Sequence, residues 1–242
     1  MATPSVLIVI PTYNEAANLP ALLSRLAALS SLNLRFVVID DNSPDGTGHL
    51  ADKLAASLPL TVIHRQRKRG LGTAYAETFS RLTRGELGAH PDLIIQMDAD
   101  LSHDPAAVPA LISAASAADL VIGSRYVHGG RIANWDFRRR FLSRAGNFYA
   151  RRVLRLPYRD LTSGFKCYHW QVLAKLPWNS VSSVGYNFQI ETVFFAHQRG
   201  FSIREVPITF TERRQGSSKL NFSIILESFW KVAALRFRAR SL

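Results

Sequence analysis

The sequence of 242 residues contains one cysteine, Cys167, so it can form neither an internal disulfide nor a cysteine-rich zinc site. Long apolar runs are also missing. The apolar stretch at residues 6–10 is too short for a secretory signal or a membrane span, and the weakly polar stretch at 106–118 is interrupted by Pro109. We therefore expect a protein of a reducing compartment, with no segment in the core of a membrane.

Acidic residues are scarce in the second half of the chain. Residues 125–242 carry 6 of them against 21 lysines and arginines, a net charge of +15, whereas residues 1–124 carry 12 acidic and 9 basic residues, a net charge of −3. With 47% hydrophobic and 20% charged residues, the whole chain has the composition of a folded protein with a full core. The basic half predicts an anionic partner: nucleic acid, an anionic membrane surface or a phosphorylated substrate.

Up to residue 123, short runs of β-branched residues alternate with longer amphipathic segments. The runs predict strands at 6–10, 35–39, 60–64, 93–97 and 120–122, and the segments predict helices near 15–29, 45–58, 72–84 and 104–117. Such alternation is typical of an α/β fold with a mostly parallel sheet, in which ligands bind beyond the carboxyl ends of the strands. The less regular second half predicts helices near 136–156 and 186–199, a strand near 202–210 and an amphipathic segment at 221–240.

Asp98 and Asp100 flank Ala99 directly after the predicted strand at 93–97. In extended backbone, residues two apart project to the same side, so both carboxylates can meet one divalent cation. Mg²⁺ and Mn²⁺ prefer oxygen ligands and are commonly held by one or two carboxylates and the phosphates of a substrate. An Asp-x-Asp pair is also frequent in surface turns, but its position at the predicted ligand-binding edge favours a metal site.

A second acidic segment, DDNSPDG at residues 40–46, follows the predicted strand at 35–39. Together with Asp52 it nearly fits a helix–loop–helix calcium loop. We reject that interpretation because a strand precedes the segment and because Pro44 with the following Asp-Gly suits a tight turn. We expect instead that Asp40 or Asp41 accepts hydrogen bonds from a bound nucleotide, as acidic residues at the end of a second strand do in nucleotide-binding sheets.

Basic residues gather in three places. The turn at 65–69 precedes a glycine-bearing helix start at 70–73, which is either a phosphate site or a solvated turn. In the predicted helix 136–156, seven arginines flank an apolar stripe, so either the helix packs on the core with a wet basic face or its arginines bind phosphate. The last segment, with Phe229, Trp230 and Leu235 beside arginines, is interpreted as an interfacial helix on an anionic membrane or as a helix docked on its own domain.

Eight segments together resemble the dolichol- and polyprenol-phosphate mannose synthases of glycosyltransferase family 2, in order and over nearly the whole chain. They are IPTYNEAANLP (10–20), VIDDNSPDGT (38–47), GLGTAY (70–75), MDADLSHDP (97–105), GSRY (123–126), DLTSGFKCY (160–168), GYNFQIE (185–191) and GSSKL (216–220). Each segment alone is shared by many enzymes of family 2. The combination of DDNSPDGT, DADLSHDP and TSGF is specific to this branch.

The resemblance implies a nucleotide-sugar-binding fold of the type called GT-A, a Rossmann-like sheet flanked by helices with amphipathic C-terminal helices. It implies that mannose passes from GDP-mannose to a polyprenyl phosphate, with inversion at the anomeric carbon and with Mg²⁺ or Mn²⁺ as cofactor. The chemistry of the residues agrees. A divalent cation with arginine and lysine neutralises the leaving diphosphate, and a phosphate acceptor is already anionic, so no strong general base is required.

The resemblance also assigns roles to single residues. Asp98, Asp100 and Arg125 are implied to be catalytic, with Asp98 and Asp100 holding the metal and, with Ala99, the diphosphate. Arg139 and Ser143, one helical turn apart, match positions that receive the lipid phosphate. The remaining donor-binding positions are Pro11, Tyr13, Glu15, Ile39 and Asp41 for the guanosine part, and Arg213 and Lys219 as basic contacts.

We expect one catalytic domain over residues 1–242: a nucleotide-sugar-binding part at 1–124, an acceptor-binding part at 125–220 and an amphipathic helix at 221–242. The basic half and this helix predict a cytoplasmic enzyme that is peripheral on the cytoplasmic face of an anionic membrane. A family 2 enzyme using another sugar nucleotide, such as UDP-glucose, on a polyprenyl phosphate or a polysaccharide is the alternative. We expect no nucleic acid as a partner, because the acidic cluster at the ends of the predicted strands would repel phosphates unless a metal intervened. This cluster consists of Asp40, Asp41, Asp98, Asp100 and Asp104.

Overall fold

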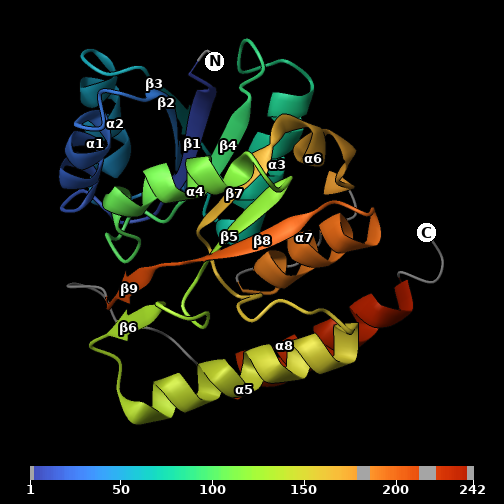
Figure 1. Cartoon of the computed structure of the whole chain (residues 1–242). Helices are drawn as coiled ribbons and strands as arrows, with labels where there is room; N and C mark the ends of the chain where they lie inside the picture. Colours follow the sequence, from blue (N-terminus) through green and yellow to red (C-terminus); the bar gives the residue numbers. More distant parts are fainter. Residues whose placement is uncertain (1–2, 179–185, 213–221, 239–242) are drawn as a thin grey trace.

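The computed structural model describes residues 3–178, 186–212 and 222–238, which form an α/β fold around one large sheet (Figure 1). The five strands expected in the first half are all present, and the predicted mostly parallel sheet is confirmed. The strands of the large sheet are β1 (Ser5–Thr12), β2 (Asn33–Asp40), β3 (Leu60–His64), β4 (Leu93–Gln96), β5 (Leu120–Ser124), β7 (Lys166–His169) and β8 (Ile203–Pro207).

The order of the strands in this sheet is β3-β2-β1-β4-β7-β5-β8. All neighbouring pairs are parallel except those of β7, which runs antiparallel to both β4 and β5. A second, two-stranded sheet pairs β6 (Arg131–Ala133) with β9 (Thr209–Thr211). The strand expected at 202–210 is thus two strands in different sheets, and the expected strands did not include β6 or β7.

The helices cover both faces of the large sheet, because successive side chains of a strand point to opposite faces. In β1, Ile8 and Ile10 belong to a buried cluster with leucines of α1 and α4, whereas Leu7 and Val9 belong to a second cluster with aromatic residues of α3 and α7. The helices are α1 (Leu19–Ala27), α2 (Thr47–Ala55), α3 (Leu71–Thr83), α4 (Val108–Ala115), α5 (Phe137–Leu154), α6 (Trp170–Lys175), α7 (Tyr186–Gln198) and α8 (Phe222–Arg238), and the 3₁₀ turn η1 (Pro105–Ala107) precedes α4.

Helices α5 and α8 lie side by side along one end of the molecule (Figure 1), where the Tyr149 and Phe229 rings are 4.3 Å apart between centroids. The expected apolar stripe of α5 does not pack on the core at Phe137 and Phe141, which are 80% and 65% exposed. The helix buries Asn147, Ala150 and Leu154 instead. This face lies against the loop after residue 156, where the backbone N–H of Leu161 donates to Oδ1 of Asn147.

Helix α8 has one face docked on its own domain and large hydrophobic side chains on the other face. Val232 and Leu235 are buried against the protein, whereas Trp230 and Phe237 are 76% and 68% exposed. In the part of the chain that the structure describes, every large hydrophobic side chain with high exposure belongs to α5 or α8. Among those same residues, no helix has the length and apolar character that crossing a membrane would require.

Candidate active site

A cavity of about 530 Å³ opens at the carboxyl ends of β1, β2, β4 and β5, the edge at which the sequence predicts ligand binding. Ile39 does not line this cavity, because its side chain points into the core. Arg213 and Lys219 lie outside the described residues. The other predicted site residues all line the cavity: Pro11, Tyr13, Glu15, Asp41, Asp98, Ala99, Asp100, Arg125, Arg139 and Ser143.

At the β1–β2 side of the cavity, Asp41 is buried and accepts hydrogen bonds from three groups. These are Nη1 of Arg65 at 2.6 Å and the backbone N–H groups of Arg69 and Gly70 at 3.0 and 2.9 Å. Arg65 and Arg69 also pair with Glu77. The basic turn at 65–69 is therefore not simply solvated, because its Arg65 is buried and holds the predicted nucleotide-binding carboxylate in place.

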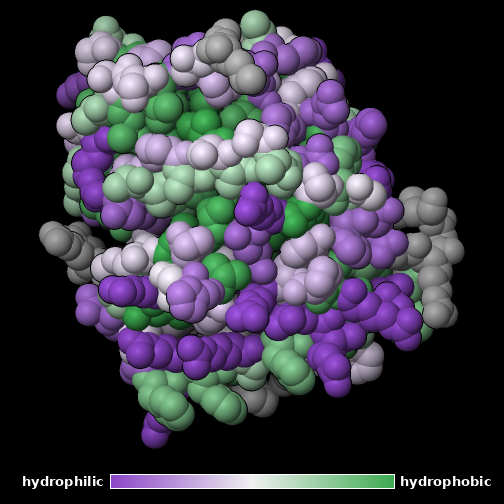
Figure 2. All heavy atoms as spheres, viewed as in Figure 1, coloured by the Kyte–Doolittle hydropathy of each residue, from purple (hydrophilic) through white to green (hydrophobic). Residues whose placement is uncertain are grey.

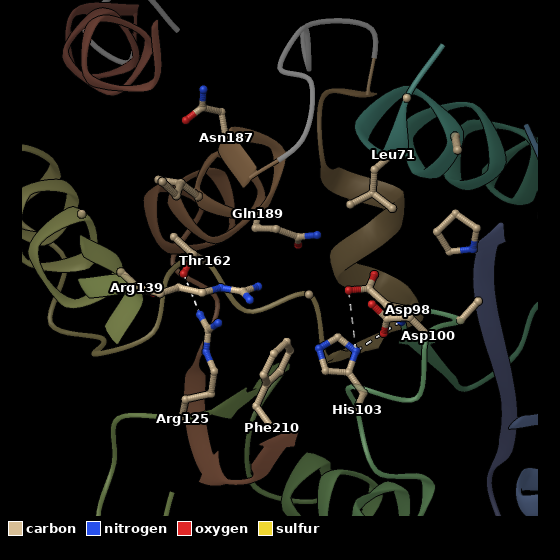
Figure 3. A pocket seen from close by; sticks show the side chains of 18 of the residues that line it. Leu71, Asp98, Asp100, His103, Arg125, Arg139, Thr162, Asn187, Gln189 and Phe210 are labelled. Atoms are coloured by element: carbon tan, nitrogen blue, oxygen red, sulfur yellow. Dashed lines mark hydrogen bonds and ion pairs between the residues drawn. The ribbon is translucent and has the colours of Figure 1, made fainter. Parts of the chain in front are cut away.

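Directly after β4, Asp98 and Asp100 lie next to each other at the wall of the cavity (Figure 3). His103 is buried beside them, and burial lowers the pKa of its imidazole. The backbone N–H of Asp98 donates to Nδ1 of His103 at 3.2 Å, which places the proton of the neutral ring on Nε2. A Cβ atom at Gly164 would lie 3.3 Å from Oδ2 of Asp98, so the glycine of the TSGF segment leaves room for this carboxylate.

On the opposite side of the cavity, Arg125 forms a buried ion pair with Asp160. Its Nε and Nη2 donate to the two carboxylate oxygens, each at 2.7 Å, and Nη2 also donates to the Thr162 hydroxyl at 2.7 Å. The guanidinium carbon lies 5.3–5.6 Å from the ring centroids of Tyr126, Trp135 and Phe210. An arginine so held offers a fixed positive charge to a ligand in the cavity.

Arg139 and Ser143 project from α5 into the same cavity, and Figure 3 shows the guanidinium groups of Arg139 and Arg125 close together. Nη1 of Arg139 pairs with Oε1 of Glu212 at 2.5 Å, and its guanidinium lies 4.3 Å from the Trp135 ring centroid. The Tyr126 hydroxyl donates to Oγ of Ser143 at 2.7 Å. The two residues that the resemblance assigns to a lipid phosphate therefore line the same cavity.

A buried polar network lies between the acidic and the basic sides of the cavity. Lys166 of β7 is fully buried, and burial lowers the pKa of its amine well below the usual value, against the opposing influence of Asp160 and Asp98. Its Nζ lies 2.7 Å from Oε1 and 2.9 Å from the backbone oxygen of Gln189. Nε2 of Gln96 donates to the same Oε1 at 2.7 Å.

These residues were not assigned a role from the sequence, although Lys166 and Gln189 stand inside two of the quoted segments, DLTSGFKCY and GYNFQIE. Asp160 and Glu212 were likewise not identified. The only available signal was that Asp160, Lys166 and Gln189 stand inside quoted segments, and Glu212 stands in none of them. Their roles depend on contacts between positions far apart in the chain, such as Arg125 and Asp160, which no spacing rule connects.

A comparison with family profiles matches residues 7–176 to the family described as glycosyl transferase family 2. The chain belongs to glycosyltransferase family 2. Two curated members of similar size are its relatives over nearly their whole length. Polyprenol monophosphomannose synthase of Mycolicibacterium smegmatis is 45% identical over 98% of this chain and 89% of its own length. Undecaprenyl-phosphate mannosyltransferase of Micrococcus luteus is 43% identical over 97% of this chain and 95% of its own length.

A third relative of this family 2 chain, dolichol-phosphate mannosyltransferase of Pyrococcus furiosus, is 37% identical over 91% of the chain, which spans 60% of that protein. The resemblance to polyprenol-phosphate mannose synthases is therefore confirmed. Among solved structures, glucosyl-3-phosphoglycerate synthase of Mycobacterium tuberculosis in complex with Mn²⁺, UDP and glucosyl-3-phosphoglycerate superimposes with a TM-score of 0.70 at 17% identity. That alignment covers 98% of this chain and 80% of the other and supports the expected GT-A fold.

Proposed function

We propose that this family 2 enzyme transfers mannose from GDP-mannose to a polyprenyl phosphate and releases GDP. The observation that carries the proposal is that one cavity joins the Asp98–Asp100 pair to Arg139 and Ser143. The first pair suits a metal-bound diphosphate, and the second suits the phosphate of an acceptor. The relatives named as polyprenol- and undecaprenyl-phosphate mannosyltransferases support both the sugar and the acceptor class.

The residues at the acidic side fit a divalent cation. Carboxylate oxygens are hard ligands of the kind that Mg²⁺ and Mn²⁺ prefer. In the described part of the chain no group of three or more histidine, cysteine, aspartate or glutamate side chains forms a metal site, so Asp98 and Asp100 would share the ion with oxygens of the diphosphate. When bound, the ion supplies positive charge at the leaving diphosphate.

The protein groups on the opposite side would hold the acceptor and guide the displacement. A phosphate oxygen of the acceptor attacks the anomeric carbon, and the bond from that carbon to the diphosphate breaks, so GDP leaves with the electron pair. Arg139 and Ser143 orient the acceptor phosphate, and Arg125 stabilises negative charge inside the cavity. The acceptor is anionic before it reacts, so the neutral His103 is not needed as a base.

We further propose that the acceptor arrives from an anionic membrane surface at the cytoplasmic face. The exposed Phe137, Phe141 and Trp230 can insert among lipids, and the arginines of α5 can contact anionic headgroups. Figure 2 shows hydrophobic and hydrophilic side chains next to each other over α5. In this arrangement residues 1–124 bind the nucleotide sugar, residues 125–220 bind the acceptor and residues 221–242 contribute the amphipathic helix.

The test is a transfer assay with purified protein, a short polyprenyl phosphate, Mn²⁺ or Mg²⁺, and labelled GDP-mannose or UDP-glucose. We expect lipid-linked mannose that disappears when a chelator is added. Lipid-linked glucose without mannose would overturn the choice of donor and establish the alternative enzyme. If a folded protein that binds GDP-mannose transfers mannose only to an acceptor other than polyprenyl phosphate, the choice of acceptor is wrong.

A further inference from the structure

The amide of Gln189 is a polar group of the cavity wall that the reaction described above does not use. Gln189 stands in the first turn of α7 and lines the cavity, and Figure 3 shows its side chain pointing into the space between the acidic pair and the two arginines. The residue is 1% exposed. Its Nε2 has no hydrogen-bond partner among the described residues. A buried N–H donor without a partner is unfavourable, which points to a ligand atom that accepts the bond.

The orientation of this amide is fixed by its neighbours. Nζ of Lys166 and Nε2 of Gln96 both lie 2.7 Å from Oε1 of Gln189, so two donors occupy the two acceptor positions of that oxygen. A flipped amide would place its nitrogen against both of those nitrogens. Gln96 is held in turn by the hydroxyl of Tyr168, 3.0 Å from Oε1 of Gln96. The nitrogen of Gln189 therefore points away from Lys166 and Gln96, and the residue itself lines the cavity.

Lys166 is itself anchored independently of this side-chain contact. Its Nζ lies 2.9 Å from the backbone oxygen of Gln189 and 3.3 Å from Oγ1 of Thr192, both on α7. Three acceptors thus surround an amine that ends a fully buried side chain on β7. Lys166 links β7 to α7 through these contacts and fixes the orientation of the Gln189 amide. It is therefore a positioning residue and need not contact the ligand.

We propose that Nε2 of Gln189, oriented by Lys166 and Gln96, donates a hydrogen bond to a hydroxyl of the sugar that is transferred. This inference rests on the proposed function, because it takes the ligand between Asp98 and Arg125 to be a nucleotide sugar. An oxygen acceptor is required by the donor character of Nε2. A sugar hydroxyl fits this requirement midway between the groups assigned to the diphosphate and to the acceptor phosphate, where the transferred ring must lie.

The deciding experiment compares the affinities for GDP and for GDP-mannose, measured by calorimetry with Mn²⁺ in the wild type and in Gln189→Met. Methionine keeps the length and volume of the side chain but has no N–H donor. We expect the affinity for GDP-mannose to fall about fivefold to twentyfold and the affinity for GDP to be unchanged. Gln198→Met is the matched control, because Gln198 is an exposed glutamine at the end of the same helix, and it should change neither affinity.

Deoxy donors identify the hydroxyl. For the hydroxyl that Nε2 contacts, GDP-deoxymannose should bind the wild type and Gln189→Met equally, since the bond is missing in both. Equal weakening of GDP and GDP-mannose in Gln189→Met would overturn the proposal in favour of a diphosphate contact. Unchanged affinity for both would overturn it as well, with a Tm near that of the wild type showing that the variant is folded.

The role of Lys166 is tested through the same ratio of affinities. In a folded Lys166→Met variant we expect the selective loss for GDP-mannose, and in the double variant with Gln189→Met no further loss. Additive losses would overturn the positioning role. If the wild type binds UDP-glucose rather than GDP-mannose, the proposed donor is wrong, and comparing UDP with UDP-glucose in Gln189→Met then tests the sugar contact by itself.

Discussion

Arg125 and Asp160, which are 35 positions apart in the chain, form a bidentate ion pair inside the protein. The Asp160 side chain is fully buried and the Arg125 side chain is 6% exposed. The carboxylate also accepts the backbone N–H of Arg125 at 2.9 Å, so it fixes both the main chain after β5 and the plane of the guanidinium. The aspartate of the DLTSGF segment thus holds the arginine of the GSRY segment in a fixed orientation.

The substitution Asp160→Asn tests this relationship. It leaves a buried guanidinium without its counter-charge, so we expect the free energy of unfolding to fall by about 3–5 kcal/mol. We also expect a decrease in kcat that is larger than the change in KM for the donor, because the charge of Arg125 is then no longer fixed. Urea titration and steady-state kinetics measure the two effects.

Asp52→Asn is the matched control for that variant, because Asp52 pairs with His64 at the surface and its side chain is 49% exposed. Its effect on the free energy of unfolding should stay within about 0.5 kcal/mol. Wild-type stability together with wild-type kcat in Asp160→Asn would contradict the role of the ion pair.

Binding of the metal ion should depend on both carboxylates after β4. In Asp98→Asn and Asp100→Asn we expect Mn²⁺ binding, followed by electron paramagnetic resonance, to weaken strongly and kcat to fall by about 100-fold or more. The control is Asp104→Asn, because Asp104 belongs to the same segment but pairs with Arg25 and caps η1. Wild-type affinity for Mn²⁺ in both site variants would show that the ion binds elsewhere.

The alternation of elements was predictable from the sequence because it depends on local periodicity. Strands such as β1 and β4 are continuous apolar runs that are buried on both faces, and the helices between them have clear apolar stripes. Strand β7 (Lys166–His169) was not among the predicted strands because its residues, KCYH, begin with a buried lysine and do not form a continuous apolar run. Its position between β4 and β5 is decided by tertiary packing, which periodicity does not report.

The candidate site was predictable where a residue acts through its own chemistry. Asp98 and Asp100 were predicted from their carboxylates and their place after a strand, whereas Arg139 and Ser143 of α5 were assigned by the resemblance. All four line the cavity. Gln189 was missed because the orientation of its amide depends on a contact with Lys166, which stands 23 positions earlier in the chain. Likewise, the stripe on α5 gave the spacing of Phe137 and Phe141 but not the direction in which they face, since an amphipathic pattern is the same toward a core or a lipid surface.

Membrane binding should depend on the exposed aromatic residues of α5. The double substitution of Phe137 and Phe141 by serine removes two large apolar side chains from the surface, so we expect binding to anionic vesicles at low salt to weaken about tenfold or more. Co-sedimentation measures the bound fraction. Vesicles of neutral lipid provide the control for the electrostatic part, and they should bind the wild type more weakly. Equal sedimentation of both proteins with anionic vesicles would rule out this surface.

Cys167 should be unreactive in the folded protein. It lies in β7 between Ile95 of β4 and Val121 of β5, and burial raises the pKa of its thiol from the ordinary value of 9.0 to about 12. Since only the thiolate attacks a disulfide reagent, we expect no labelling of the native protein at about pH 8 and complete labelling in urea. Labelling of the native protein as fast as of the unfolded chain would contradict the buried position.

The same shift makes stability depend on pH in a defined direction. Above about pH 9 the thiol ionises in the unfolded chain but stays protonated in the folded one, so the unfolded state is favoured as the pH rises toward 12. The contribution is about 1.4 kcal/mol per pH unit for one group. Other buried groups, including Tyr75 and Tyr168, add to the total slope because burial raises the pKa of their hydroxyls too. The variant Cys167→Val isolates the contribution of the thiol. Between about pH 9 and 11 the free energy of unfolding of this variant should fall less steeply than that of the wild type, by about 1.4 kcal/mol per pH unit. Equal slopes would show that the thiol titrates alike in the folded and unfolded states.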